Sequence, residues 1–536
     1  MHHNLLLYLL LLSAVFMLIM LAKKIKIAYP LLLVVAGLGI GYIPGMPPVT
    51  MDPDLIFLIF LPPLLYEAAW YTSWNDFWKW KRPIGLLAFG LVIFTSTIVA
   101  FVAVAIIPGF TLPMGFLLGG IISPPDAVAA TSVLKNIKIP KRIVTILEGE
   151  SLVNDASSLI VFRFALAAVL TGKFSVHEAA INFFMVTIMG VLVGLAVAHV
   201  MYFIHRFLPT TSSIDAAFTL IAPYFMYLAA EQFHYSGVMA VVSGGLFLSY
   251  RSHEIFMDGQ SRMQTVNVWS TLAIILNGLV FILIGLELPV ILDGLGSYSP
   301  ADAWTYGLII SAIVIAIRML WIFPAAYIPR YLFKSIRTSE PNPGWKGAFI
   351  IGWAGMRGVV SLAAALSLPL LLETGADFPF RNLIIFITFV VILVTLVFQG
   401  LTLPFIIKAI KITEIDPVMP DDQQETGIKL RLTQAALKRL EEHYELDAAR
   451  SDLVGVLRTE LQNNVAQSIQ RLESLDCDET QQHEISNYNK ILKDLYKVQR
   501  AELYHIRKEK AFSDEAIRQQ EMQIDLAELN STNHRY

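Results

Sequence analysis

The feature that most constrains this chain is a succession of thirteen apolar stretches within its first 410 residues. About 20 apolar residues in a helix, rising roughly 1.5 Å each, span the hydrocarbon core of a bilayer. The chain of 536 residues is 55% hydrophobic and only 15% charged, whereas soluble domains are about 25% charged. We therefore predict an all-α polytopic membrane protein with about 13 transmembrane helices, over residues 4–22, 27–43, 54–72, 84–107, 113–135, 143–170, 179–204, 215–232, 236–250, 266–287, 303–329, 347–371 and 382–407.

The connecting loops predict how these helices are oriented. Every second loop is basic, whereas the loops between them carry only Lys173 and Arg381. Because Lys and Arg concentrate on the cytoplasmic side, we expect the N-terminus outside and the C-terminal tail inside a plasma (inner) membrane. The first lysines follow the first apolar stretch, which is the wrong polarity for a cleaved signal peptide. The basic loops hold Lys23, Lys24, Lys26, Lys79, Lys81, Arg82, Lys135, Lys138, Lys141, Arg142, Arg206, Arg251, Arg262, Arg330, Lys334, Arg337 and Lys346.

The remaining composition argues against several other classes of protein. A net charge of −3, with no finger, basic stripe or aromatic platform in the sequence, argues against nucleic acid as a partner. The single cysteine, Cys477, provides neither an internal disulfide nor a cysteine metal cluster. The histidines are scattered near the ends of the predicted spans, without the pattern of a membrane-embedded hydrolase. We expect no cofactor and no enzymatic activity.

After Ile412 the composition changes to Glu, Gln, Lys and Arg, with apolar residues at helical spacing. We therefore divide the chain into a transmembrane domain, residues 1–411, and a cytosolic helical domain, residues 412–536. Two interpretations of the second domain remain open: a helical appendage that lends stability or dimer contacts, and a regulatory sensor. Its apolar positions are Leu453, Leu457, Leu461, Val465, Ile469, Leu472, Ile485, Tyr488, Leu492 and Leu495.

The stretch 143–170 carries ionisable residues near its middle, in the sequence Gly-Glu-Ser-Leu-Val-Asn-Asp at 149–155. Ser151 and Asp155 are four residues apart and share a helix face, and Glu150 and Asn154 share the neighbouring face. An ionised carboxylate near the bilayer centre costs about 2.5–3.5 kcal/mol, so such groups face a protein interior or a water-filled path. The motif predicts a carrier of ions or protons.

A second carboxylate lies in a stretch that prolines interrupt. Pro124 and Pro125 each remove a backbone donor from the stretch 113–135, so two half-helices are expected there. Asp126 then lies in the first turn of the second half, where unpaired N–H groups favour a carboxylate. Discontinuous helices near the midplane are a recurrent way for transporters to build ion sites. The alternative is a proline kink with an N-capping aspartate.

Asp126 and Asp155 together predict a site for a small cation. Two carboxylates with nearby hydroxyl and amide oxygens form a hard-oxygen ligand set. Burial favours the neutral form of a carboxyl group, so a proton can compete with the cation for the same oxygens. Competition at one site is sufficient for exchange.

Arg318 and Arg357 lie within apolar stretches and need partners. A buried guanidinium must be paired because its desolvation is otherwise uncompensated. Glu150 is the natural partner, since its face is turned away from Asp155. Arg357 lies in Gly355-Met356-Arg357-Gly358, which suggests a second loosened helix and an inverted repeat. Ordinary glycine packing between helices explains these glycines equally well. Arg318 lies in the stretch 303–329.

Two further charged residues lie outside these motifs. Glu67 follows Leu61-Pro62-Pro63 and lies in the cytoplasmic half of the third stretch, where it either completes the site or snorkels to the interface. Arg163 lies eight residues beyond Asp155, about 12 Å further outward by helix rise. The sequence offers no partner for Arg163.

These motifs together resemble the monovalent cation:proton antiporters of the NhaP/NHE type, the sodium/proton exchangers of bacteria and animals. The resemblance covers roughly residues 5–410, and its strongest elements are the motif at 149–155, Asp126 in a broken fifth helix, Phe60-Leu61-Pro62-Pro63 with Glu67, and the motif at 355–358. It implies thirteen helices with inverted repeats, crossed unwound fifth and twelfth helices, and a homodimer embedded in membrane lipid.

The resemblance also implies roles for individual residues. Asp155 would carry the exchanged proton or cation. Ser151, Asp126, Glu67 and the Pro125 backbone carbonyl would help to hold Na⁺, and Asn154 would orient the site. Glu150 and Arg318 would form a structural ion pair, and Arg357 would stabilise the helix crossover. Asn-Asp at 154–155 is typical of electroneutral members, which implies one-for-one exchange.

One departure and two alternatives accompany this resemblance. Many animal-type members have the proline after the aspartate of the fifth helix, whereas here Pro124 and Pro125 precede Asp126. Potassium or lithium in place of sodium is an alternative, because cation choice depends on cavity geometry. A cation channel gated by the tail is another, although the sequence shows no selectivity filter.

Overall fold

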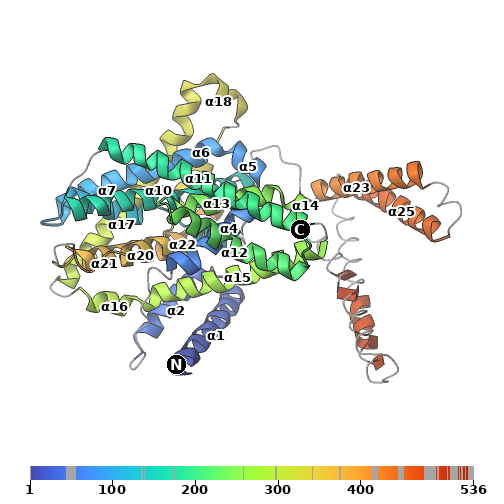
Figure 1. Cartoon of the computed structure of the whole chain (residues 1–536), viewed down its shortest axis with the longest axis horizontal. Helices are drawn as coiled ribbons and strands as arrows, with labels where there is room; N and C mark the ends of the chain where they lie inside the picture. Colours follow the sequence, from blue (N-terminus) through green and yellow to red (C-terminus); the bar gives the residue numbers. More distant parts are fainter. Residues whose placement is uncertain are drawn as a thin grey trace. The chain divides into compact units, whose positions relative to one another are not determined.

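The computed structural model divides the chain into two compact units, Met1–Asp416 and Pro417–Tyr536, whose elements are shown in Figure 1. Within the described residues the regular structure is helical, and a single isolated β-bridge pairs Leu371 with Asp377. The predicted all-α membrane class is confirmed. The described residues are 2–43, 56–134, 137, 139–172, 176–256, 259–295, 298–340, 342–372, 376–412, 421–444, 452–475 and short pieces between 491 and 528.

Each of the thirteen predicted stretches coincides with one helix or with a run of consecutive helices. Eight helices in the described residues are long and apolar enough to cross a membrane, and three shorter apolar helices accompany them. The number of crossings stays a prediction. The bounds are α1 His2–Ile25, α2 Tyr29–Gly41, η1 Ile56–Phe60, α4 Leu61–Tyr71, α5 Trp74–Lys79, α6 Lys81–Gly85, η2 Leu86–Leu91, α7 Val92–Ile106, α8 Leu112–Ile122, α9 Ala127–Leu134, α10 Lys141–Thr171, α11 Val176–Phe207, α12 Ser212–Glu231, α13 Gly237–Tyr250, α14 Ser252–Ile255, α15 Gly259–Leu286, α16 Leu288–Asp293, α17 Pro300–Leu332, α18 Lys334–Ser339, α19 Gly344–Trp353, α20 Val359–Leu366, α21 Arg381–Val394, η3 Thr395–Gln399 and α22 Gly400–Ile410.

Helix α10 lies where two apolar clusters of the first unit meet. Its first turns, including Ile143 and Leu147, pack into a large cluster with α7, α8, α17 and α21. Its middle, including Leu152 and Ala156, packs into a second cluster around α4, α11, α12 and α13. The motif at 149–155 lies where these two parts of α10 meet, so its polar side chains are next to both packed groups of helices.

Two stretches are broken at their middles. The first runs through α8, a non-helical segment over 123–126, and α9. The second runs through α19, a segment over 354–358, and α20. The two breaks touch each other, because the Asp126 N–H donates to the Met356 carbonyl at 2.6 Å. Pairing through backbone groups satisfies atoms that the interrupted helices leave without intrahelical partners.

The second unit contains two helices, α23 Asp421–His443 and α25 Asp452–Leu475, that pack on each other. Their predicted apolar stripe is only partly covered, since Leu457 is 46% and Ile469 is 39% exposed. Several sequence predictions fall outside the described residues or side chains: Lys135, Lys138, Lys173, Cys477, Leu453, Ile485, Tyr488 and Leu492.

Candidate ion-binding site

One face of α10 is joined to the first break by two hydrogen bonds. The Ser151 hydroxyl accepts a bond from the Ala127 N–H at 3.1 Å. The Asn154 amide donates to the Pro125 carbonyl at 2.9 Å. Ser151 and Asn154 therefore bind the residues on either side of Asp126, which sets this carboxylate against the α10 helix.

The Asp126 carboxylate lies at the start of two helices. Its Oδ1 accepts the Val128 N–H at 2.8 Å and so caps α9. Gly358 directly precedes α20, and a Cβ added there would overlap the Asp126 carboxylate. Only glycine allows this approach. Since helix amino termini carry partial positive charge, α9 and α20 both favour an anion at this position.

Asp155 completes a group of oxygen atoms on the same side of α10. It is 8% exposed and lies close enough to Asp126 for the two charges to repel each other. The Asn154 Oδ1 is buried and accepts no hydrogen bond. Two carboxylates, a hydroxyl and an amide oxygen are ligands that alkali cations prefer. Among the described residues, no three His, Cys, Asp or Glu side chains cluster as a transition metal would require.

Arg357 in the second break is fully buried and is directed at the backbone of the first break. Its Nε donates to the Ile122 carbonyl at 3.1 Å and its Nη2 to the Ser123 carbonyl at 3.4 Å. These carbonyls end α8, where no intrahelical donor is available. The Arg357 N–H in turn donates to the Thr395 hydroxyl at 3.1 Å.

Glu150 and Arg318 form a bidentate pair that is shut off from solvent. The Arg318 Nη1 and Nη2 donate to the two Glu150 carboxylate oxygens at 2.5 and 2.8 Å, and the two side chains are 0% and 1% exposed. Arg318 also donates to the Ile351 carbonyl near the end of α19, at 3.1 and 3.3 Å. A Cβ at Gly355 would overlap the Arg318 side chain. The geometry matches a structural pair, since all charges are satisfied internally.

Glu67 lies on α4 and is partly exposed. No hydrogen bond of its carboxylate to Asp126, Asp155 or Ser151 occurs in the described residues. Tyr29, at the start of α2, is close enough to Asp126 and Glu67 to interact electrostatically with both carboxylates. No sequence pattern pointed to Tyr29, because aromatic residues are common at the start of an apolar stretch.

Arg163 has a partner that the sequence did not identify. Its Nη2 donates to both carboxylate oxygens of Glu231 at 2.7 and 2.8 Å. Glu231 ends α12 and also accepts the Gly237 N–H at 3.2 Å. This pair ties α10 to α12 and α13 at a distance from the carboxylate site. Both side chains are substantially exposed.

Comparison with known proteins identifies the family. The transmembrane region of the sodium/hydrogen exchangers matches residues 11–409. The chain belongs to this family. The family consists of membrane transporters and not of enzymes, and the protein is an integral, multi-pass membrane protein.

Several curated relatives share this region. A sodium, potassium, lithium and rubidium/H⁺ antiporter of Bacillus pumilus is 33% identical over 78% of this chain and 62% of its own length. The corresponding protein of Bacillus subtilis is 33% identical over 71% of this chain and 58% of its own length. The chain thus spans about three fifths of these two relatives. The Na⁺/H⁺ antiporter ApNhaP of Aphanothece halophytica is 31% identical over 78% of this chain and 75% of its own.

Solved structures show the same fold. The sodium proton antiporter MjNhaP1 of Methanocaldococcus jannaschii, at pH 8, aligns with a TM-score of 0.57 and 20% identity, over 74% of this chain and 96% of that one. An electron-microscopy structure of the same antiporter aligns with a TM-score of 0.61 and 19% identity, over 78% and 100%.

Proposed function

We propose that the protein is a secondary antiporter that exchanges Na⁺ for H⁺ at Asp155. The observation that carries this proposal is the group of oxygens that Ser151, Asn154 and Asp155 present to the break at Asp126. A proton on Asp155 removes a charge that the cation otherwise neutralises. The two substrates therefore exclude each other, as coupled exchange requires.

The charges of the site support electroneutral, one-for-one exchange. Glu150 and Arg318 cancel each other. Asp126, Asp155 and Arg357 together leave one net negative charge near the two breaks. One Na⁺ or one H⁺ balances that charge, and a buried charge left unbalanced is costly. The site then has the same net charge when it carries Na⁺ in one direction and when it carries H⁺ in the other.

Packing supports alternating access by relative movement of two groups of helices. The carboxylate site lies on α10, where the two apolar clusters meet. Sliding along this boundary would expose Asp155 first to one side and then to the other. The alternation of basic loops supports an external N-terminus and a cytoplasmic tail in a plasma (inner) membrane. A homodimer surrounded by lipid is the assembly that we propose.

Potassium and lithium remain the second candidate substrates. The names of the two Bacillus relatives include both ions, and the same oxygens can serve several alkali cations. A tail-gated cation channel would instead produce flux without obligatory proton movement.

The test is proton flux into sealed liposomes that hold the purified protein, with Na⁺, Li⁺ or K⁺ added on one side. We expect cation-dependent proton movement that is unchanged when the membrane potential is clamped and is lost in Asp155→Asn. The exposed Asp302→Asn serves as a matched control for the same chemical change. Full exchange by Asp155→Asn would exclude Asp155 as the carrier.

The second unit is proposed to regulate exchange. Truncation after about residue 412 removes α23 and α25 and leaves the candidate site intact. We expect retained transport with a shifted dependence on pH or ion concentration. Loss of membrane insertion on truncation would contradict this regulatory role.

A further inference from the structure

The end of α17 and the short helix α18 form an exposed segment, residues 331–337, that projects from the helices around it (Figure 1). Its sequence, Tyr-Leu-Phe-Lys-Ser-Ile-Arg, combines large apolar side chains with two basic ones and contains no acidic residue. Tyr331, Leu332 and Phe333 are 89%, 64% and 59% exposed. Three consecutive apolar residues exposed to this extent indicate a partner that covers them.

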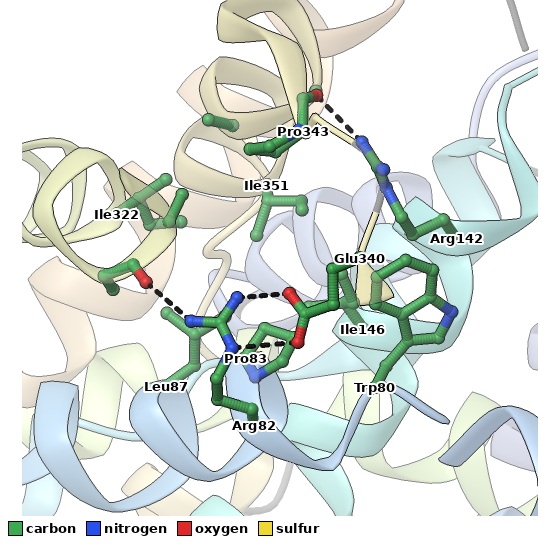
Figure 2. A pocket seen from close by; sticks show the side chains of 14 residues that line it. Trp80, Arg82, Pro83, Leu87, Arg142, Ile146, Ile322, Glu340, Pro343 and Ile351 are labelled. Atoms are coloured by element: carbon green, nitrogen blue, oxygen red, sulfur yellow. Dashed lines mark hydrogen bonds and ion pairs between the residues drawn. The ribbon is translucent and has the colours of Figure 1, made fainter. Parts of the chain in front are cut away.

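Both ends of this segment are fixed to the first unit. The Arg82 Nε and Nη2 on α6 donate to the two Glu340 carboxylate oxygens at 2.9 and 2.5 Å, as Figure 2 shows. The Arg82 Nη1 also donates to the Ala325 carbonyl of α17 at 3.3 Å. The Arg330 Nη1 donates to the Glu340 carbonyl at 2.5 Å. The chain therefore leaves the helix bundle after Arg330 and returns to it at Glu340, so the exposed position of the segment is set by bonds on either side.

The apolar surface of the segment continues the outer face of a membrane span. Helix α17 is among the helices that are long and apolar enough to cross a membrane. The exposed large hydrophobic side chains of its second half are spaced by three, four and seven residues, which places them on one helix face. An exposed apolar face of a membrane span contacts lipid, and the segment extends this face. The side chains are Leu320, Tyr327, Ile328, Tyr331 and Leu332.

The length of α17 places the segment at the surface of the membrane. The helix has 33 residues and is therefore about 50 Å long. The hydrocarbon core is about 30 Å thick, and the bilayer with its headgroups is about 40–45 Å thick. The last turn of α17 therefore reaches the headgroup layer when its first turn lies in the opposite one. Tyrosine and other amphipathic aromatic residues are enriched at this depth.

Two basic side chains of the segment are available to a partner. Lys334 and Arg337 are exposed on α18, and neither side chain has a hydrogen bond or an ion pair in the described part of the chain. They are three residues apart and therefore lie on the same side of this short helix. Apolar side chains beside two unpaired cations complement a membrane surface that contains anionic lipids.

We propose that residues 331–337 lie in the headgroup layer of the cytoplasmic leaflet and bind anionic phospholipid headgroups. The three apolar side chains pack on the first acyl carbons, and Lys334 and Arg337 bind the phosphates. The proposal rests on the orientation proposed above, but it does not depend on which cation is exchanged. Because the chain continues from Glu340 into α19, the segment anchors the start of the second broken stretch at the membrane surface.

The test places a fluorophore on the segment of the full-length protein in bilayers. Cys477, the single cysteine, is replaced by serine, and Tyr331→Cys carries the label, with Phe333→Cys as a second position if the first variant fails to fold. The bilayers contain phosphatidylcholine with brominated phosphatidylglycerol or with brominated phosphatidylcholine, because bromine quenches a fluorophore that the lipid contacts. Leu320→Cys on the same face of α17 is the control inside the membrane, and Ala436→Cys on the exposed surface of α23 is the control outside it.

We expect lipid to quench the Tyr331→Cys label as it quenches the Leu320→Cys label, and phosphatidylglycerol to quench it more strongly than phosphatidylcholine. Lys334→Gln combined with Arg337→Gln should lower this preference for phosphatidylglycerol at least about fivefold, since one basic residue near an anionic surface contributes about that factor.

A matched double variant controls for the change in net charge. Lys429→Gln with Arg431→Gln removes the same charge from exposed positions on α23 and should leave the preference unchanged.

The proposal would be overturned by a Tyr331→Cys label that lipid quenches no more than the Ala436→Cys label, because the segment would then lie in water. Equal quenching by the two lipids, or an unchanged preference after Lys334→Gln with Arg337→Gln, would exclude binding of anionic headgroups. Quenching that appears only after truncation at residue 412 would assign the surface to the second unit instead. None of these results depends on cation exchange, which the liposome flux measurement tests separately.

Discussion

The two broken helices are similar in form and opposite in chemistry. The break between α8 and α9 contains two prolines and ends in Asp126, whereas the break between α19 and α20 contains two glycines and Arg357. Prolines interrupt the first helix by removing N–H donors. The glycines of the second allow Arg318 and the Asp126 carboxylate to approach the backbone. The first break thus contributes the Asp126 carboxylate to the site. The second break lets the Arg318 side chain and the Asp126 carboxylate approach its backbone closely.

The two arginines donate to backbone carbonyls, whereas Asp126 accepts a backbone hydrogen bond through only one of its carboxylate oxygens. Arg357 binds the last carbonyls of α8, and Arg318 binds the Ile351 carbonyl near the end of α19. Each guanidinium therefore satisfies the carboxyl end of a half-helix. Asp126 caps α9 with one oxygen, and Asp155 on α10 lies close enough to Asp126 for their charges to repel. The arginines therefore stabilise the contact between the two breaks, while the aspartates remain available for a cation or a proton.

The largest effect on stability is expected from Arg357→Met. The substitution leaves the buried carbonyls of Ile122 and Ser123 without a donor, at about 1–3 kcal/mol for each group. Thermal unfolding in detergent should therefore occur at a markedly lower temperature, with Arg337→Met on the exposed α18 as the control. An unchanged unfolding temperature would show that the second break does not depend on its arginine.

Asp126→Asn should separate function from stability. An asparagine Oδ1 can still accept the Val128 N–H and cap α9, so the unfolding temperature should change little. Removal of one carboxylate should weaken the apparent affinity for the cation at least about tenfold, a loss of about 1.4 kcal/mol. Liposome exchange measured over a series of Na⁺ concentrations checks this. Wild-type affinity would remove Asp126 from the proposed site.

Gly358→Ala should affect both breaks at once, because the added methyl group overlaps the Asp126 carboxylate. Overpacking of this kind costs about 1–3 kcal/mol, so both the unfolding temperature and exchange should fall. Gly39→Ala is the matched control, since a Cβ there meets open space. Equal behaviour of the two variants would contradict the close approach of α20 to Asp126.

The smallest effect on transport is expected from Thr395→Val. It removes the hydroxyl that accepts the Arg357 N–H, and loss of one buried acceptor costs about 1–3 kcal/mol. We expect a modest decrease in unfolding temperature with unchanged cation affinity. A selective change in affinity would mean that the second break takes part in ion binding.

Patterns along single helices predicted much of this arrangement. The spacing within 149–155 placed Ser151 and Asp155 on one face of α10, and the prolines before Asp126 located the first break. These features depend on helix periodicity and on missing N–H donors, which are local properties of the sequence. The predicted helical class followed from the apolar stretches in the same way.

Of the contacts between distant segments, the Glu150–Arg318 pair was predicted, and several others were not. Gly358 against Asp126, Thr395 against Arg357 and Glu231 against Arg163 join residues that are far apart in the chain. Such pairs depend on how helices pack, and no periodicity encodes which helix faces which.

The most direct test of the central claim is calorimetric titration of the purified protein with Na⁺ at several pH values, in buffers of different ionisation enthalpy. Competition at Asp155 predicts release of about one proton per Na⁺ bound. It also predicts that, while the site is mostly protonated, the apparent Kd for Na⁺ rises about tenfold for each unit by which the pH falls. The reason is that one proton then competes with one Na⁺. Asp155→Asn should abolish both effects. Na⁺ binding without proton release, or pH-dependent binding that persists in Asp155→Asn, would contradict the claim that cation and proton share this carboxylate.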